Sequence, residues 1–303
     1  MKLLKWMFGL LLALVVALSL IGYLYLYVLP TGPQKTDVRP TGAGKDSFVI
    51  NAYQHTERKT IRVWTYKPQQ WTADGQVLFV MHGMGRNAES YLDAWSEIAE
   101  RKNLLLVAPE FDSRFYRVIT NDYQEGNLKS YFGWNNPQSE WAFTVVENIF
   151  DQLNTINHWS LEHYDMFGHS AGGQFVQRMV AVKPEARVRK AIAANAGSYT
   201  FMQETVPYPF GLGGVQHNLN ASFGKQLVLL LGELDNNAEQ GVLDQSEAAM
   251  RQGANRLQRG QNFFSVAEAV AKKADYPFHW TLQLVPKVGH DYQKMSEAAA
   301  TLL

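Results

Sequence analysis

One pentapeptide carries residue types that could do chemistry: Gly168-His169-Ser170-Ala171-Gly172, which matches the pattern G-x-S-x-G. Such a turn places a serine on a strained corner between a strand and a helix, with its hydroxyl exposed and small residues beside it. The apolar run YDMF precedes the turn and a helical pattern follows it. Ser170 is therefore the candidate nucleophile. The alternative is a glycine-rich turn that only tightens a strand-to-helix corner.

A nucleophilic serine also needs an oxyanion hole, in which two backbone N–H groups stabilise the charge on the attacked carbonyl oxygen. One donor belongs to the residue after the serine, here Ala171, and the other to a loop after an earlier strand. That loop is predicted at His82-Gly83-Met84-Gly85, with Met84 at the position of the second donor. As an alternative, the segment is a tight turn in which Asn87 caps the next helix, and both interpretations can hold together.

The general base should be a histidine downstream of the serine. Three histidines follow Ser170: His217, His279 and His290. His290 comes shortly after the strand pattern WTLQLV, at its carboxyl end, whereas His279 precedes that strand and His217 lies in a glycine-rich segment. His290 is therefore the predicted base. The alternative, a surface-loop histidine, would leave Ser170 without a proton acceptor.

The third member of such a catalytic triad should be a carboxylate that lies between Ser170 and His290 in the sequence. It orients the imidazole and stabilises its protonated form. Residues 226–231 predict a strand, and GELDNN follows it. Asp235 in this segment is the first choice, Glu233 the reserve and Asp244 a third candidate. Asp235 could instead cap a turn.

The elements that must position these residues follow from short apolar runs that alternate with helical patterns. An antiparallel pair is predicted at 47–53 and 60–66, and further strands at 77–81, 104–108, 164–167, 191–195, 226–231 and 280–285. Helices are predicted at about 88–102, 141–153, 171–182 and 292–302. This alternation indicates an α/β fold with a mostly parallel sheet covered on both faces, in which ligands bind outside the carboxyl ends of the strands.

Composition excludes several classes of function. The 303 residues carry 28 Lys and Arg against 28 Asp and Glu, so the basic surface that nucleic-acid binding needs is not indicated. The absence of cysteine excludes disulfides, thiolate metal sites and a cysteine nucleophile. The chain has no HExxH motif, and Gly83-Met84-Gly85 lacks the third glycine of a dinucleotide site. We therefore expect neither a metal nor another cofactor.

The first 29 residues are predicted to form a membrane anchor. Trp6 to Leu29 is a run of 24 residues without a charge, and as a helix it would span about 36 Å, enough for a bilayer core. The alternative is a cleaved signal peptide. Lys2 and Lys5 favour a cytoplasmic N-terminus, which would put the rest of the chain in the periplasm or outside the cell. Residues 30–46, rich in Pro and Gly, predict a linker, and 47–303 the catalytic domain.

Residues 47–303 resemble the α/β-hydrolase superfamily. The motifs that carry the resemblance are HGMGRN, VAPEFD, GHSAGG, ANAGSYT, GELDNN and VGHD. Within the superfamily they are similar to the esterases related to polyhydroxyalkanoate depolymerases and feruloyl esterases. The resemblance implies hydrolysis of carboxylic esters by Ser170, His290 and Asp235 through an acyl-enzyme. Secreted depolymerases commonly carry cysteines and an added substrate-binding module, and this chain departs from them in both respects.

The sequence defines the substrate-binding residues less clearly than the candidate catalytic residues. Aromatic residues gather in 110–140 and 198–224, which leave from the active edge and could form pocket walls or a lid, or pack locally. His169, Tyr199 and Arg86 are the candidate substrate contacts, although Arg86 could instead pair with a nearby carboxylate. The expected substrate is a small-molecule or oligomeric ester. The alternatives are a peptidase, thioesterase or acyltransferase with the same triad, and a non-catalytic binding protein.

Overall fold

The computed structural model describes residues 2–303 except 30–31, 34, 55, 119 and 240. At its centre lies an eight-stranded sheet in the order β1-β2-β4-β3-β5-β6-β7-β8. The strands are β1 (Gly44–Tyr53), β2 (Thr56–Lys67), β3 (Gln76–Met81), β4 (Leu104–Glu110), β5 (Tyr164–His169), β6 (Val188–Ala194), β7 (Gln226–Gly232) and β8 (Trp280–Val285). β1, β2 and β4 pair antiparallel, and the pairings from β4 to β8 are parallel. The mostly parallel sheet predicted from the sequence is confirmed.

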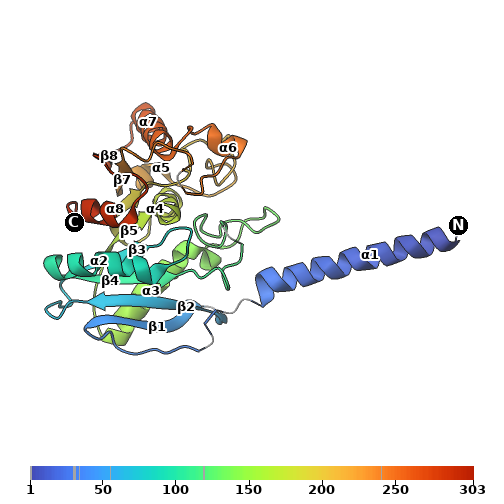
Figure 1. Ribbon diagram of the computed structural model, residues 1–303, viewed down its shortest axis with the longest axis horizontal. Helices are drawn as coiled ribbons and strands as arrows, with labels where there is room; N and C mark the ends of the chain where they lie inside the picture. Colours follow the sequence, from blue (N-terminus) through green and yellow to red (C-terminus); the bar gives the residue numbers. More distant parts are fainter. Residues whose placement is uncertain (1, 30–31, 34, 55, 119, 240) are drawn as a thin grey trace.

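Helices cover both faces of this sheet (Figure 1). They are α2 (Ala88–Lys102), α3 (Ala142–Asn157), α4 (Ala171–Val182), α5 (Leu219–Phe223), α6 (Glu247–Met250), α7 (Arg256–Ala274) and α8 (Tyr292–Ala300). Side chains alternate along the buried strands, so that Val77 and Phe79 join one core while Leu78 and Val80 join the other. α2 and α8 pack on the second core, and α3, α4 and α7 on the first. This two-sided burial explains the nearly continuous apolar runs of the central strands.

α1 (Lys2–Tyr23) projects from the domain as a separate rod (Figure 1) and continues as a π-helix over Leu24–Val28. It contains no buried residue, and Lys2–Leu26 is long and apolar enough to cross a membrane. An apolar helix without protein around it needs another apolar environment. The structure thus contains the helix that the sequence predicts as an anchor, in a form that also fits a signal sequence.

Part of the predicted linker is attached to the domain. Residues 30, 31 and 34 of it lie outside the described residues, but Asp37 N–H donates to Val49 O at 2.8 Å. Thr41 is buried, and its N–H donates to Asn157 Oδ1 at 2.7 Å. β1 already begins at Gly44. The predicted linker from Asp37 onward therefore contributes contacts to the folded domain, which the Pro and Gly content alone does not reveal.

α7 is the one long helix of the domain that the sequence analysis does not predict. Its sequence RLQRGQNFFSVAEAVAKKA has arginines at the first two inward positions and a glycine near its start. Arg256 and Arg259 are nevertheless buried, and Gly260 lies against Leu231, where a methyl group would come within 2.7 Å of Leu231 Cδ1. Because buried arginines occupy positions where an apolar pattern would be expected, the helical periodicity is masked.

Candidate active site

Ser170 occupies the sharp turn between β5 and α4. Its backbone has φ 59° and ψ −116°, a combination that is strained for a residue with a Cβ atom. The Ser170 N–H donates to Ala194 O at 2.9 Å, and the Ser170 carbonyl accepts from Gln174 N at 3.0 Å. β6 and the first turn of α4 therefore hold the turn from both sides and maintain the strained conformation.

The two glycines of the turn are required by close backbone approach. A methyl group on Gly168 would lie 2.2 Å from Gly172 O, and one on Gly172 would lie 2.1 Å from Met81 O. Distances this short are repulsive for a carbon atom beside a carbonyl oxygen. The spacing of glycines around Ser170 thus lets the start of α4 pack directly on the end of β3.

The structure brings Ser170, His290 and Asp235 together from three loops. His290 Nε2 lies 3.1 Å from Ser170 Oγ, and His290 Nδ1 lies 2.7 Å from Asp235 Oδ2. Because an ionised carboxylate only accepts hydrogen bonds, the Nδ1 position carries the proton and the Nε2 lone pair faces the serine hydroxyl. Asp235 is fully buried, whereas Glu233 and Asp244, the other two candidates, are exposed. The geometry is that of a serine, its base and the group that orients the base.

Arg256 lies behind Asp235 and is absent from the sequence prediction. Its Nη1 is 3.3 Å from Asp235 Oδ1, and its Nη2 donates to Val242 O at 2.9 Å. The side chains of both ion partners are almost completely buried, at 1% and 0% exposure. Arg256 therefore holds the carboxylate oxygen that His290 does not use. Its position at the first residue of α7, the helix that was not predicted, explains why no sequence signal pointed to it.

Asn195 connects the loops that carry the acid and the base. Its Nδ2 donates to Gly289 O at 3.0 Å, next to His290, and its Oδ1 accepts from Gly232 N at 2.8 Å. Its backbone adopts φ 46°, which asparagine tolerates better than most residues. The resemblance motif ANAGSYT contains Asn195, but residue type and position alone did not indicate this role.

The predicted oxyanion loop lies beside the serine. A methyl group added to Gly83 would come 3.8 Å from Ser170 Cβ and 2.6 Å from Tyr91 Oη. Met84 follows it at the surface, with 37% of the residue exposed, and Ala171 is buried at the start of α4. The loop after β3 and the turn after β5 therefore meet at one place, where their backbone can approach a substrate oxygen.

His82 anchors this loop from inside. Its Nε2 accepts from Phe111 N–H at 3.1 Å, so its Nδ1 is the donor to Gly83 O at 2.9 Å. Tyr123 Oη donates to His82 O at 2.7 Å, and the two rings lie 4.4 Å apart. Burial, together with the nearby Arg86 charge, lowers the pKa of His82 to about 3. His82 is thus a neutral histidine with both ring nitrogens occupied.

This burial predicts an acid sensitivity of the fold. Below pH 6.5 the unfolded chain protonates residue 82, while the folded chain does so only near pH 3, so stability falls as pH falls through that window. We expect His82→Gln, which can keep one donor and one acceptor, to reduce the slope of unfolding free energy against pH by about one proton. Urea titrations between pH 7 and 5 measure this slope. An unchanged slope in a folded variant would contradict the buried neutral state.

The three candidate substrate contacts, His169, Tyr199 and Arg86, are all buried and pack against other residues of the domain. His169 is 2% exposed, and its Nδ1 lies 3.1 Å from Tyr91 Oη, with its ring 4.5 Å from that of His290. Burial holds the pKa of His169 well below its usual range, so His169 packs beside His290 as a neutral ring. Tyr199 is fully buried and stacks on Phe263 at 4.8 Å.

Arg86, the third candidate, is 7% exposed. Its guanidinium lies 4.7 Å from the Tyr123 ring and donates to Phe111 O at 2.5 Å. These contacts tie the oxyanion loop to the segment after β4 and direct the charge inward. Residue type and closeness to a motif suggested these three contacts, whereas packing turns all three side chains away from the surface.

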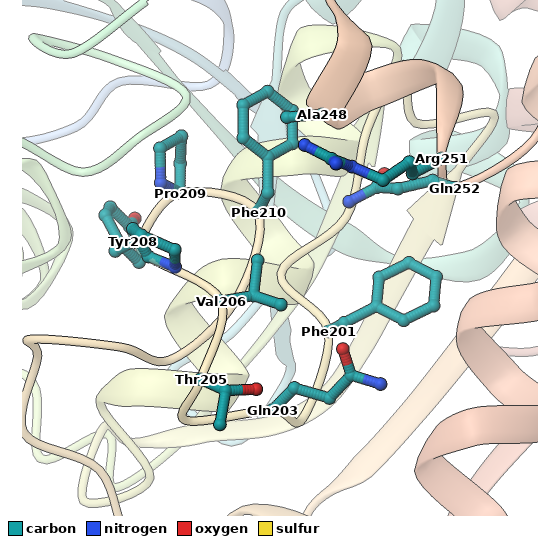
Figure 2. Close-up of a pocket in the computed structure, with 11 residues that line it drawn as sticks. Phe201, Gln203, Thr205, Val206, Tyr208, Pro209, Phe210, Ala248, Arg251 and Gln252 are labelled. Carbon is teal, nitrogen blue, oxygen red and sulfur yellow. The ribbon is translucent and has the colours of Figure 1, made fainter.

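The segment 198–224 contributes to a cavity of about 800 Å³ (Figure 2). Its lining is mainly apolar and aromatic, with Arg251 and two glutamines, and comprises Phe201, Gln203, Thr205, Val206, Pro207, Tyr208, Pro209, Phe210, Ala248, Arg251 and Gln252. Ser170 does not line this cavity. Tyr199, in contrast, is fully buried in the core. The aromatic residues of this segment therefore divide between local packing and a cavity wall.

The described residues contain no group of three or more His, Asp or Glu side chains placed to hold a metal ion. The arrangement at Ser170 instead consists of a hydroxyl, an imidazole and a carboxylate in one hydrogen-bonded row. Such a row can make an alcohol oxygen nucleophilic by moving its proton to the imidazole.

Comparison with known proteins finds solved structures that are similar to most of this chain. No protein-family model matches the chain, and no curated protein matches it. Among solved structures it is similar to poly(aspartic acid) hydrolase-1 from Sphingomonas sp. KT-1, with 34% identity and a TM-score of 0.82 over 86% of this chain and 99% of that one. A poly(3-hydroxybutyrate) depolymerase from Bordetella parapertussis is 31% identical, with a TM-score of 0.82 over 86% and 89%.

A more distantly similar structure shares only the fold with this chain. A fluorophosphonate-binding serine hydrolase from Staphylococcus aureus is 12% identical, with a TM-score of 0.54 over 86% of this chain and 97% of that one. The first two proteins, in contrast, share about a third of their residues with this chain over most of both lengths.

Proposed function

The chain belongs to the α/β-hydrolase superfamily, and from this premise we propose that it is a membrane-anchored serine hydrolase that cleaves carboxylic esters. The observation that carries the proposal is the unbroken row from Ser170 Oγ to His290 Nε2, at 3.1 Å, and from His290 Nδ1 to Asp235 Oδ2, at 2.7 Å. The poly(3-hydroxybutyrate) depolymerase among its relatives acts, by its name, on a polyester. An oligomeric or small-molecule ester is the substrate class that fits.

The proposed mechanism uses the same row of residues in both half-reactions. His290 takes the proton of Ser170 Oγ as that oxygen attacks the ester carbonyl, and the buried Asp235 carboxylate stabilises the imidazolium. The backbone N–H groups of Ala171 and Met84 would stabilise the tetrahedral oxyanion. His290 then protonates the leaving alcohol, an acyl-enzyme forms, and a water activated by His290 releases the acid. No cofactor enters this scheme.

A second candidate function is amide hydrolysis by the same residues. The relative with 34% identity is a poly(aspartic acid) hydrolase, and poly(aspartic acid) is joined by amide bonds. Amides differ from esters mainly in their poorer leaving group, which the same base must protonate as it departs. The two candidates therefore share a mechanism and differ in which bond is cleaved faster.

Two measurements on the purified full-length chain separate these possibilities. We expect a fluorophosphonate probe to label the wild-type protein and not Ser170→Ala. We also expect p-nitrophenyl esters of increasing acyl length to be cleaved faster than the matched p-nitroanilides. Faster cleavage of the anilides would favour the amide hydrolase. A folded wild-type protein that neither labels nor turns over either series would indicate a non-catalytic member of the superfamily.

The anchoring part of the proposal rests on α1. The helix carries no charged residue from Trp6 onward, none of it is buried, and Lys2 and Lys5 lie in its first turn. Positive charge at this end favours a cytoplasmic N-terminus. We therefore place residues 1–29 in the membrane, with the catalytic domain that follows in the periplasm or outside the cell.

A further inference from the structure

Three aromatic side chains, here called the aromatic tip, stand exposed at the end of the long segment between β4 and α3. Tyr131 is 66% exposed, Phe132 63% and Trp134 74%. They belong to the stretch SYFGWNN, residues 130–136, which contains no charged residue. Burying such side chains is strongly favourable, and large aromatic groups left in water at these fractions are unusual for a surface without a partner.

The aromatic tip is held in a defined turn by backbone hydrogen bonds, and the Phe132 ring lies 5.6 Å from that of Tyr131 and 5.8 Å from that of Trp134. Ser130 N–H donates to Trp134 O at 2.7 Å, and Gly133 N–H donates to Ser130 O at 2.9 Å. Gly133 has φ 86°, which permits the tight reversal. Lys129 and Asn135 form a bridge below it, and Leu128 at the base is buried. Backbone hydrogen bonds thus present the three rings outward together.

The aromatic tip lies on the side of the domain from which α1 departs. In Figure 1 the green loop before α3 projects toward the side where α1 leaves. Arg117, in the same segment, donates to Tyr25 O at 2.8 Å, and its guanidinium lies 4.0 Å from the Tyr25 ring. The segment that carries the aromatic tip therefore also contacts the domain-proximal end of the apolar helix.

We propose that the aromatic tip inserts into the headgroup region of the bilayer that α1 crosses. The proposal rests on α1 being a membrane anchor. Tyr and Trp favour this region because their rings are apolar and their OH and NH groups remain hydrated. The aromatic tip contains no charged residue, so no ion has to lose its water when the tip inserts. The segment that carries the tip already contacts Tyr25, at the end of the apolar helix, through Arg117. A lipid surface is thus the partner that these features favour over a second protein chain.

This docking has a consequence for the orientation of the domain. The segment with the aromatic tip follows the carboxyl end of β4, and Ser170 follows that of β5. β3 runs parallel to both strands, so these ends lie at one edge of the sheet. Insertion of the aromatic tip therefore turns the edge that carries Ser170 toward the lipid surface. Amphiphilic esters held in the bilayer would then be within reach without leaving it.

The absence of cysteine makes a direct test possible. A single Phe132→Cys substitution in the full-length chain takes one NBD label, and Gln70→Cys, an exposed position in the turn before β3 at the opposite sheet edge, is the matched control. Both proteins are reconstituted into phosphatidylcholine vesicles with and without doxyl-labelled lipid. We expect quenching by the doxyl lipid to be several-fold stronger at position 132, and quenching by aqueous iodide to be weaker there.

The outcomes distinguish lipid from other partners. Equal exposure of both labels to iodide overturns the proposal, and so does shielding of position 132 from iodide without doxyl quenching, which would assign the aromatic tip to a protein contact. Adding Tyr131→Ser and Trp134→Ser to the labelled Phe132→Cys chain should reduce doxyl quenching, and no reduction would also count against insertion. Circular dichroism establishes that each variant is folded. The readout requires α1 to anchor the chain in the vesicles, but it does not depend on hydrolysis, so it is independent of the proposed ester cleavage.

Discussion

Replacing Ser170 with alanine is expected to lower kcat for ester hydrolysis on the order of 10⁶-fold, because the row that activates the nucleophile loses its reacting atom. His290 and Asp235 keep their own hydrogen bond at 2.7 Å, so the site is otherwise preserved. The free energy of unfolding should change by less than about 1 kcal/mol. Initial rates on p-nitrophenyl esters and urea titrations measure the two quantities.

Ser170→Gly is the matched comparison, since it also removes the hydroxyl. The strained backbone at φ 59° and ψ −116° suits glycine, and relief of this strain should raise the free energy of unfolding by about 1 kcal/mol after the entropic penalty of glycine. Loss of activity with a gain in stability would show that the strain serves the nucleophile. Wild-type rates in either variant would disprove the assignment of Ser170.

Asp235→Asn is expected to lower kcat by about 10⁴-fold while the serine and the histidine remain in place. An amide at this position can donate as well as accept, so it no longer selects the His290 tautomer whose Nε2 lone pair faces Ser170. Steady-state kinetics on the same ester give this number. The fluorophosphonate probe should still label Asp235→Asn, but more slowly than it labels the wild-type protein.

Two further variants separate the effect on His290 from effects on folding. Asp235→Asn also removes the partner of the buried Arg256, which should destabilise the fold by about 3–5 kcal/mol. The double variant with Arg256→Met removes the uncompensated charge and should recover stability without recovering activity. Glu233→Gln changes an exposed carboxylate two residues away and should leave kcat near the wild-type value. A large loss there, with activity retained in Asp235→Asn, would reverse the assignment.

The sequence alone was sufficient to predict the fold class and the strand ends at which the candidate site residues lie. Ser170, Asp235 and His290 each follow an apolar strand pattern, and parallel strands end at one edge of a sheet. The period of the apolar residues therefore predicts both the sheet and the convergence of three distant loops. The apolar run at the N-terminus likewise predicts a helix, because its composition leaves no polar face.

Other features depended on burial, which local patterns do not encode. Asp235, Glu233 and Asp244 are alike in chemistry and close in sequence, and only packing buries the first while it leaves the others exposed. His169 and Arg86 are polar residues beside motifs, yet contacts with Tyr91 and Tyr123 turn them inward. A side chain's direction is set by neighbours from other parts of the chain, so residue type and position could not predict it.

What the sequence determined by itself is the succession of the strands and of four helices of the domain, the apolar N-terminal helix and three candidate reactive residues at strand ends, because each depends on a short stretch of chain. Tertiary structure alone decided that Arg256 holds Asp235, that Asn195 joins the loops of acid and base, and that α7 forms around buried arginines. Each of these depends on contacts between residues 21 to 94 positions apart. Such contacts exist only once the whole chain has packed.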